Sequence, residues 1–373
     1  MAATMPYAGL RVLDAAGTAA PACGMLLSMF GADVYLLETS EDARNRDELE
    51  WLSYNAGKQS IVIDWSLTAC VERVRDLIAR ADVFVDAGQD LGGIVPATIN
   101  PAIIHASVTP FGLSGPEASW RGTELIAEAA GGLLFLSGDP AFPPAMAAVP
   151  VAACMAGSQA AVAVLLGLLE REKTGRGDRI DVSVQEASLS LIVGAIIGTF
   201  VSKARRPRAP VTLTAGAPER RHFETKDGGL ISWNLTTGPG FGGLNKPIIA
   251  WLQEEGGGAD LAGIDFEKIS SHNLDLDRRG RWIEEFRQFF LNKTKDELVR
   301  EAVKRRIMLH PLATIEDVVN DDVLLERNIF STLTLPDGRR VRAAGRPFLS
   351  TAYDVCLPPA VPSLGLERVY EER

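Results

Sequence analysis

The chain has 373 residues, 46% of them hydrophobic and 23% charged, which is the composition of an ordinary globular protein with room for more than one domain. Its 38 Lys and Arg residues face 48 Asp and Glu residues, and the net charge is -10. No basic cluster is longer than Arg205-Arg206-Pro207-Arg208. This balance argues against nucleic acid as a partner.

The cysteines predict neither a disulfide framework nor a metal site, because they form no CxxC pair and do not cluster with histidines. They are Cys23, Cys70, Cys154 and Cys356. A reducing cytoplasm is therefore the expected compartment, and the N-terminal residues do not resemble a secretion signal. Residues 151–169 are apolar, but their alanines, Ser158 and Gln159 favour a buried helix over a membrane span.

Short aliphatic segments alternate with helical segments in the first part of the chain. The predicted strands are Leu10–Asp14, Val34–Glu38, Lys58–Asp64, Asp82–Asp86 and Ile103–Val108, and the predicted helices are Ala20–Phe30 and Val71–Arg80. The alternation predicts an α/β fold with a doubly wound parallel sheet.

The composition changes at residues 206–218, where Pro, Gly and basic residues predict a linker. Beyond it, His222–Trp233 and Thr332–Val341 read as hairpins with Asp-Gly turns. Charged helical segments fill residues 244–306, and Thr314–Asn328 is predicted as one further helix. Of the isolated histidines, we expect His105 in the core and His310 in a loop.

The segment from Arg121 to Ser188 contains two helices rich in small residues, a double glycine, a Thr-Gly-Arg-Gly turn and a strand. This order resembles the family III CoA-transferases, which include the 2-methylacyl-CoA racemases. Further marks occur in the family's order over nearly the whole chain. They are Gly9–Asp14, Gly31–Glu38, Asn55–Asp64, Pro110-Phe111-Gly112, Arg327–Phe330 and Gly345-Arg346-Pro347.

The resemblance implies a Rossmann-like large domain with a parallel sheet, made from residues 1–205 and 331–373. It also implies a smaller α+β domain over residues 219–330 and two subunits interlocked like links of a chain. No tightly bound cofactor is implied, since the CoA thioester is a substrate.

The nucleophile of the family is an aspartate at the turn that begins the second helix. In this chain the turn is Val149-Pro150-Val151-Ala152-Ala153, so the position of the aspartate is Ala153. The histidine of the racemases corresponds to Thr123. A methyl group cannot attack an acyl-CoA, and we therefore predict no catalytic residue in this chain.

The loops that hold CoA in the family have few basic residues here. No Lys or Arg occurs between Arg80 and Arg121, and the loop after Asp86 has Gln89 and Asp90 where the family has an Arg-Pro pair. The alternative is that CoA is still bound, by backbone amides and the remaining bases. The candidate residues are Arg44, Arg46, Lys58, Phe111, Gly112, Gly131 and Gly132.

Two other groups near Ala153 in the sequence are candidates for a chemical role. Cys154 has no histidine near it in the sequence, so a packing role is favoured over a reactive thiolate. Glu124 and Glu128 have helical i, i+4 spacing and could share a proton or bind a cation, although a structural role is favoured.

The leading hypothesis is a non-catalytic subunit of a CoA-transferase that works beside a paralogue carrying the aspartate. The short passage Ala250–Gly256 resembles the succinyl-CoA:benzylsuccinate branch, which implies CoA transfer from succinyl-CoA to an aromatic or other dicarboxylic acid. Two alternatives stay open: a homodimeric acyl-CoA-binding or regulatory protein without turnover, and an engineered Asp-to-Ala change in an active transferase. An engineered change would leave the basic CoA loops in place, and this chain lacks them.

Overall fold

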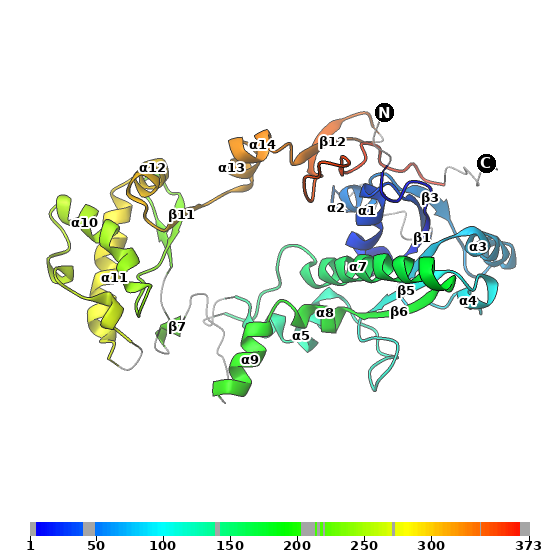
Figure 1. Ribbon diagram of the computed structural model, residues 1–373, viewed down its shortest axis with the longest axis horizontal. Coiled ribbons are helices and arrows are strands. Elements are labelled where there is room, and N and C mark those ends of the chain that lie inside the picture. The colour runs from blue at the N-terminus through cyan, green and yellow to red at the C-terminus, as the bar shows by residue number, and fades with distance from the viewer. Residues whose placement is uncertain are drawn as a thin grey trace. The chain divides into compact units, whose positions relative to one another are not determined.

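The computed structural model describes residues 5–39, 49–138, 142–202, 213–214, 217–218, 221–270, 273–335 and 337–365. The chain divides into two compact units (Figure 1). The large unit contains Met1–Ser137, Pro144–Arg206 and Asp322–Arg373, and the small unit contains Gly138–Pro143 and Pro207–Asp321.

The large unit is built on a six-stranded sheet with the order β3-β2-β1-β4-β5-β6. All its neighbouring strands pair in parallel. The strands are β1 (Arg11–Ala15), β2 (Asp33–Glu38), β3 (Gln59–Val62), β4 (Val83–Asp86), β5 (Ile104–Thr109) and β6 (Asp178–Ser183). The predicted fold class is confirmed. The strand order reverses between β1 and β4, since β2 and β3 lie on one side of β1 and β4 to β6 lie on the other, and such a reversal is where ligands bind in open parallel sheets.

Helices cover both faces of this sheet because successive strand residues point to opposite sides. Val12 belongs to one core, together with residues of α1 and α7, whereas its neighbour Leu13 belongs to another, with residues of α3. The helices of this unit are α1 (Pro21–Met29), α2 (Leu49–Asn55), α3 (Thr68–Arg80), α4 (Pro96–Ile99), α5 (Glu124–Ala130), α6 (Leu133–Leu136), α7 (Val151–Thr174), α8 (Val184–Leu189), α9 (Val193–Ser202) and α14 (Asp322–Glu326).

The long helix α7 packs closely against α1. A Cβ atom added at Gly157 would lie 3.0 Å from the backbone nitrogens of Ala22 and Cys23, so only glycine permits this approach of the two helices. By length and composition α7 could cross a membrane, but 50% of its most apolar window is buried inside the protein. That burial is typical of a core helix.

The C-terminal part of the chain returns to the large unit as a hairpin, β12 (Phe330–Thr334) and β13 (Arg340–Ala344). Leu333 joins Met29 and Ala56 in a small core that also contains Val355 and Leu357. Both ends of the chain thus contribute to this unit, and the second predicted hairpin is confirmed.

The small unit combines a three-stranded antiparallel sheet with a group of helices. Its strands are β9 (His222–Glu224), β10 (Leu230–Trp233) and β11 (Leu309–Leu312), and its helices are α10 (Lys246–Glu254), α11 (Leu276–Leu291), α12 (Lys295–Arg305) and α13 (Ile315–Val319). The predicted hairpin around Asp227-Gly228 is confirmed by the β9–β10 pairing. Its core is aromatic, with the rings of Trp233 and Phe286 at 4.3 Å between centroids.

Three sequence expectations need correction or completion. His310, expected in a loop, lies in strand β11, where it pairs with Ser232. The single helix predicted over Thr314–Asn328 is wrong, since α13 ends at Val319 and α14 begins at Asp322. The polar run Asn320-Asp321-Asp322 explains the break, because Asn and Asp side chains compete for backbone groups and favour helix ends. Within the expected linker, the described residues form the strand pair β7 (Leu213–Thr214) and β8 (Ala217–Pro218), and the rest lies outside the described residues.

Candidate functional site

The first turn of α7 is the position where the family resemblance places a nucleophile. Ala153 lies there with only 4% of its surface exposed. The residue before the helix, Pro150, offers no side-chain cap. Instead the carboxylate of Glu124 on α5 accepts the backbone N–H of Ala152 at 2.7 Å and that of Ala153 at 2.9 Å. A carboxylate is favourable at this place, because helix N-termini carry unpaired N–H groups and partial positive charge.

A second carboxyl group, that of Glu128, faces Glu124 from the next turn of α5. Its side chain is hydrogen-bonded to Glu124, and only 1% of its surface is exposed. Burial raises the pKa of Glu128, and so do the charge and the hydrogen bond of Glu124. The i, i+4 spacing on α5 thus brings two carboxyl groups together at the start of α7.

Tyr54 of α2 contacts the same helix end. Its hydroxyl is 3.1 Å from the Sγ atom of Cys154. Burial raises the pKa of the Cys154 thiol, the Tyr54 hydrogen bond lowers it, and the charges of Glu124 and Glu50 raise it again, with a net rise. Burial likewise raises the pKa of Tyr54. A thiol with a raised pKa is a poor nucleophile near neutral pH, which favours the packing role expected for Cys154.

Gln89 follows β4 and links it to the end of β1, at the point where the strand order reverses. Its Nε2 donates to the carbonyl oxygen of Ala15 at 3.1 Å, and its Oε1 accepts the N–H of Ala87 at 2.8 Å. A neutral side chain thus joins the C-terminal ends of the two strands. A phosphate-binding crevice normally presents free N–H groups or cationic side chains at this place.

Asp86, the last residue of β4, is held by two side chains of β5 and by one backbone amide. It contacts His105 Nε2 at 2.5 Å, and it accepts from Ser107 Oγ at 2.5 Å and from the Gly88 N–H at 2.8 Å. Burial raises the pKa of Asp86, but the hydrogen bonds of His105 and Ser107 outweigh it, and the net shift is downward. His105 and Ser107 are both buried, and no serine–histidine contact is formed, so this cluster braces the sheet rather than forming a nucleophile.

The candidate CoA ligand Lys58 is turned inward. Its Nζ lies 2.8 Å from Asp14 Oδ2 and donates to Asn55 Oδ1 at the same distance, and its side chain is 2% exposed. Gly24 lets α1 approach this ion pair, since a Cβ there would lie 2.0 Å from Asp14 Oδ2. An ammonium group held in this way is not presented to a phosphate, which weighs against the expected role of Lys58.

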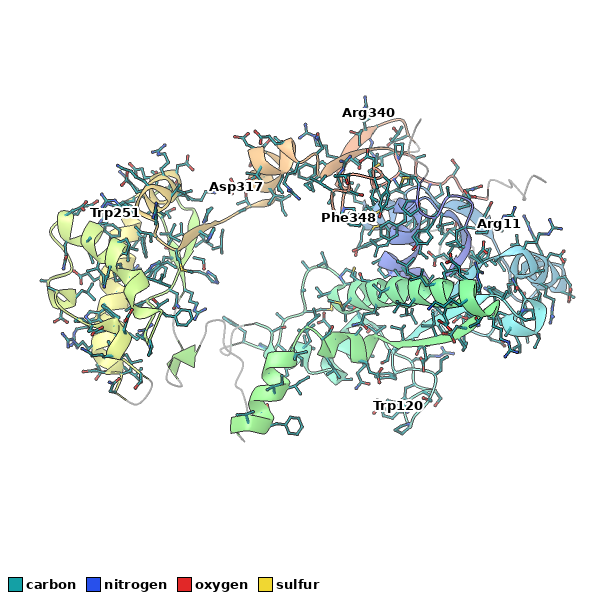
Figure 2. The ribbon with its side chains drawn as sticks, in the orientation of Figure 1. Arg11, Trp120, Trp251, Asp317, Arg340 and Phe348 are labelled. Atoms are coloured by element: carbon teal, nitrogen blue, oxygen red, sulfur yellow. The ribbon has the colours of Figure 1, made fainter. Side chains whose placement is uncertain are left out.

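The other candidate CoA residues have local structural roles in the described chain. Phe111 packs edge-on against Trp120, which lies on the loop that projects between β5 and α5 (Figure 2). Gly112 and Gly132 adopt φ +85° and +82°, which favours glycine. A Cβ at Gly131 would lie 1.8 Å from Ser188 Oγ, so this glycine allows α5 to approach α8.

The remaining sequence candidates do not assemble into a site. Arg44 and Arg46 lie outside the described residues. Thr123, at the racemase histidine position, is exposed before α5 and makes no side-chain capping bond. Within the described ranges, no three His, Cys, Asp or Glu side chains are grouped as metal ligands.

Comparison with known proteins gives consistent matches. A model of CoA-transferase family III matches residues 7–368. The succinyl-CoA–L-malate CoA-transferase beta subunit of Chloroflexus aurantiacus is 33% identical over 63% of this chain and 62% of its own length. The alpha subunit from the same organism is 26% identical over 88% of this chain and 79% of its own length. The chain therefore spans less than two thirds of the first of these relatives.

Solved structures show the same fold. A CAIB/BAIF family protein from Brucella suis has a TM-score of 0.82, at 24% identity, covering 97% of both chains. The Rv3272 protein from Mycobacterium tuberculosis has a TM-score of 0.78, at 21% identity, covering 97% of this chain and 98% of its own.

Proposed function

The chain belongs to the family III CoA-transferases, and from that premise we propose that it is the subunit without a nucleophile in a hetero-oligomeric CoA-transferase. The observation that carries the proposal is the methyl group of Ala153 at the start of α7, with the adjoining amides already bonded to Glu124. No carboxylate is free to attack at that position, so the nucleophile comes from a paralogous chain. The alpha and beta subunit names of the two malate relatives support such a pairing.

The residues around the β1–β4 point of the sheet support a non-catalytic role as well. Gln89 bridges the loops at the β1–β4 reversal, and Lys58 is neutralised by Asp14. CoA carries several phosphate charges, and its binding requires cationic side chains or free backbone amides. We infer that the productive CoA site of the complex is formed by the partner.

An uncovered apolar face on the large unit supports a partner chain. On α7, Val162, Leu166 and Leu169 follow helical i, i+4, i+7 spacing, and each is more than half exposed. On α9, Ile197, Phe200 and Val201 are also largely exposed. Soluble proteins rarely leave such faces uncovered, because each buried apolar side chain contributes about 1.5–3 kcal/mol. We propose the interlocked dimer of the family resemblance as the assembly that covers them.

For the complex we propose CoA transfer from succinyl-CoA to a dicarboxylic acid. The partner's carboxylate attacks the thioester carbonyl and releases CoA thiolate, which attacks the resulting anhydride to give an enzyme–CoA thioester and free succinate. The acceptor carboxylate then attacks that thioester, which releases CoA thiolate and leaves a mixed anhydride of the acceptor and the partner's carboxyl group. The thiolate attacks the acceptor's acyl carbon in this anhydride, giving the acceptor's CoA thioester and regenerating the partner's carboxylate. The passage that resembles the benzylsuccinate branch offers little support for an aromatic acceptor, because its one aromatic side chain, Trp251, is buried against Phe289.

Co-expression with an aspartate-bearing paralogue tests the proposal. We expect one mixed oligomer that transfers CoA from succinyl-CoA to L-malate or another dicarboxylate, while this chain alone is inactive. Benzylsuccinate serves as the aromatic comparison. If the two chains form only separate homodimers, the alternative of a stand-alone acyl-CoA-binding or regulatory protein replaces the proposal.

A further inference from the structure

Three polar side chains form a row across the antiparallel sheet of the small unit. In the register of this sheet, Ser232 of β10 pairs with His222 of β9 on one side and with His310 of β11 on the other. Paired residues of an antiparallel sheet carry their side chains on the same face. The imidazoles of the two outer strands therefore flank the short serine side chain of the middle strand.

This row lies on the face of the sheet that points away from the aromatic core. The adjacent strand residues Phe223 and Ile231 are buried in that core, and side chains alternate between the two faces of a strand. His222 and His310 are both exposed, whereas Ser232 is half-buried between them. In the described part of the chain, no hydrogen bond or ion pair engages either imidazole. Both rings are therefore accessible to a ligand from solvent.

The spacing of the row suits one metal ion. Neighbouring strands lie about 4.7–4.9 Å apart, so the backbones of the two histidines are separated by roughly 9–10 Å. Two imidazoles that lean toward each other over the middle strand can share an ion, because each zinc–nitrogen bond spans a further distance of about 2.0–2.1 Å. The side chain of Ser232 is too small to fill the space between the rings.

A carboxylate on the same face adds attraction for a cation. Glu224 follows His222 by two residues on β9, so its side chain lies on the same face, and it is exposed. The charge of Glu224 is also felt by Arg287 of α11, so this carboxylate contributes to the field rather than acting as a third ligand. The described residues contain no group of three His, Cys, Asp or Glu side chains placed as ligands. Water therefore completes the coordination of an ion held by the two histidines.

We propose that His222 and His310 bind one divalent transition-metal ion across the outer face of the small unit's sheet. Neutral imidazole favours Zn²⁺, Cu²⁺ and Ni²⁺ over Mg²⁺ and Ca²⁺, which prefer oxygen ligands. With two protein ligands, we expect an affinity in the micromolar range. The ion links β9 to β11, which are separated by β10, and so stabilises the small unit. This inference does not rest on the function proposed above.

Calorimetric titration of the full-length, chelator-treated chain with Zn²⁺ tests this inference. We expect one site per chain with micromolar affinity. His222→Asn and His310→Asn should each weaken binding at least about tenfold, because loss of even an outer-shell partner of a metal ligand costs about 10–100-fold in affinity. Zn²⁺ should also raise the thermal midpoint of the wild type, but not that of either variant, since only a bound ion stabilises the folded state.

Two matched variants of the middle residue complete the design. Ser232→Ala removes the hydroxyl group but keeps the space between the rings, so it should bind Zn²⁺ as the wild type does. Ser232→Phe introduces a residue that strands accommodate well, yet its ring fills that space and should weaken binding about as much as loss of one histidine. Mg²⁺ is the control ion and should give no saturable heat. The thermal midpoint without metal shows that each variant is folded.

Absence of saturable Zn²⁺ binding by the wild type would overturn the inference. Unchanged affinity in either histidine variant would overturn it too, because the ion would then be held by a single imidazole or by another group of the chain, such as a cysteine. Both outcomes leave the proposed hetero-oligomer untouched, and inactivity of a mixed oligomer would leave the metal titration untouched.

Discussion

The side-chain amide of Gln89 donates to the carbonyl oxygen of Ala15, 74 residues away in sequence, and so joins the loop after β4 to the loop after β1. In parallel sheets the space between these loops is where ligand phosphates bind. This hydrogen bond occupies the carbonyl oxygen of Ala15, and the neutral amide of Gln89 adds no positive charge for a phosphate. This arrangement supports the proposal that the productive CoA site belongs to the partner chain.

The first prediction concerns CoA affinity. We expect calorimetry to show no micromolar binding of CoA to the isolated chain. Gln89→Arg should tighten binding about tenfold to a hundredfold, since a charge-assisted hydrogen bond to phosphate contributes about 1.5–3 kcal/mol. Gln89→Glu, of the same size but negatively charged, is the control and should give no gain. Micromolar binding by the wild type would contradict this account.

The second prediction is that Ala153→Asp alone does not create a transferase. The new carboxyl group would lie beside Glu124 and Glu128, and like charges at such short range raise the pKa of carboxyl groups and weaken the cap on α7. We expect no turnover of succinyl-CoA with any dicarboxylate and a lowered thermal midpoint. Measurable transfer by this variant would contradict the prediction, because it would mean that the chain still positions an acyl-CoA thioester next to residue 153.

The third prediction follows from the raised pKa of Glu128. The folded chain holds this proton more tightly than the unfolded chain, so stability is fully present below the unfolded pKa and is lost as pH rises through the folded pKa. Glu128→Gln removes the titration but keeps a hydrogen-bond donor toward Glu124. Its stability relative to the wild type should therefore increase from about pH 4.5 upward, by at most about 1.4 kcal/mol per pH unit.

Denaturant titrations between pH 4.5 and 8 measure this difference. Glu186→Gln, on the exposed side of α8, is the control and should run parallel to the wild type. A constant offset between Glu128→Gln and the wild type across this range would show that the pKa of Glu128 is not raised in the folded chain.

The fourth prediction concerns the buried pair of Lys58 and Asp14. Lys58→Met leaves a buried carboxylate without its cation and should cost about 3–5 kcal/mol. Adding Asp14→Asn should recover part of this loss by removing the charge. Lys173→Met breaks an exposed pair with Glu170 and should cost less than about 0.5 kcal/mol. Equal losses for Lys58→Met and Lys173→Met in denaturant titrations would refute a structural role for Lys58.

Much of the fold could be predicted because its signals are local. Aliphatic runs of strand length alternate with helices, so the strands from β1 to β5 lie within one or two residues of their predicted bounds in most cases. Helix α2 was not predicted, since its seven residues carry too little periodicity. The helix expected over Thr314–Asn328 was wrong because a short polar run, and not a proline or glycine, ends α13.

The site was harder to predict because its contacts are distant in the sequence. The i, i+4 spacing of Glu124 and Glu128 was visible, but the contact of Glu124 with the amide of Ala153 depends on how α5 and α7 pack. Tyr54 and Gln89 acquire their partners, Cys154 and Ala15, only in the folded chain. No local pattern reports that Lys58 points inward.

The shared core of Leu333 with Met29 and Ala56 has a consequence for biosynthesis. The β1–β6 sheet is complete at Ser183, but β12 and the segment around Val355 are translated only after the whole small unit. At a synthesis rate of about 5–20 residues per second, the finished sheet lacks the last residues of this small core for on the order of ten seconds. During that interval the apolar surface of α1 around Met29 is exposed on the ribosome, and chaperone capture of the nascent chain is expected to peak there.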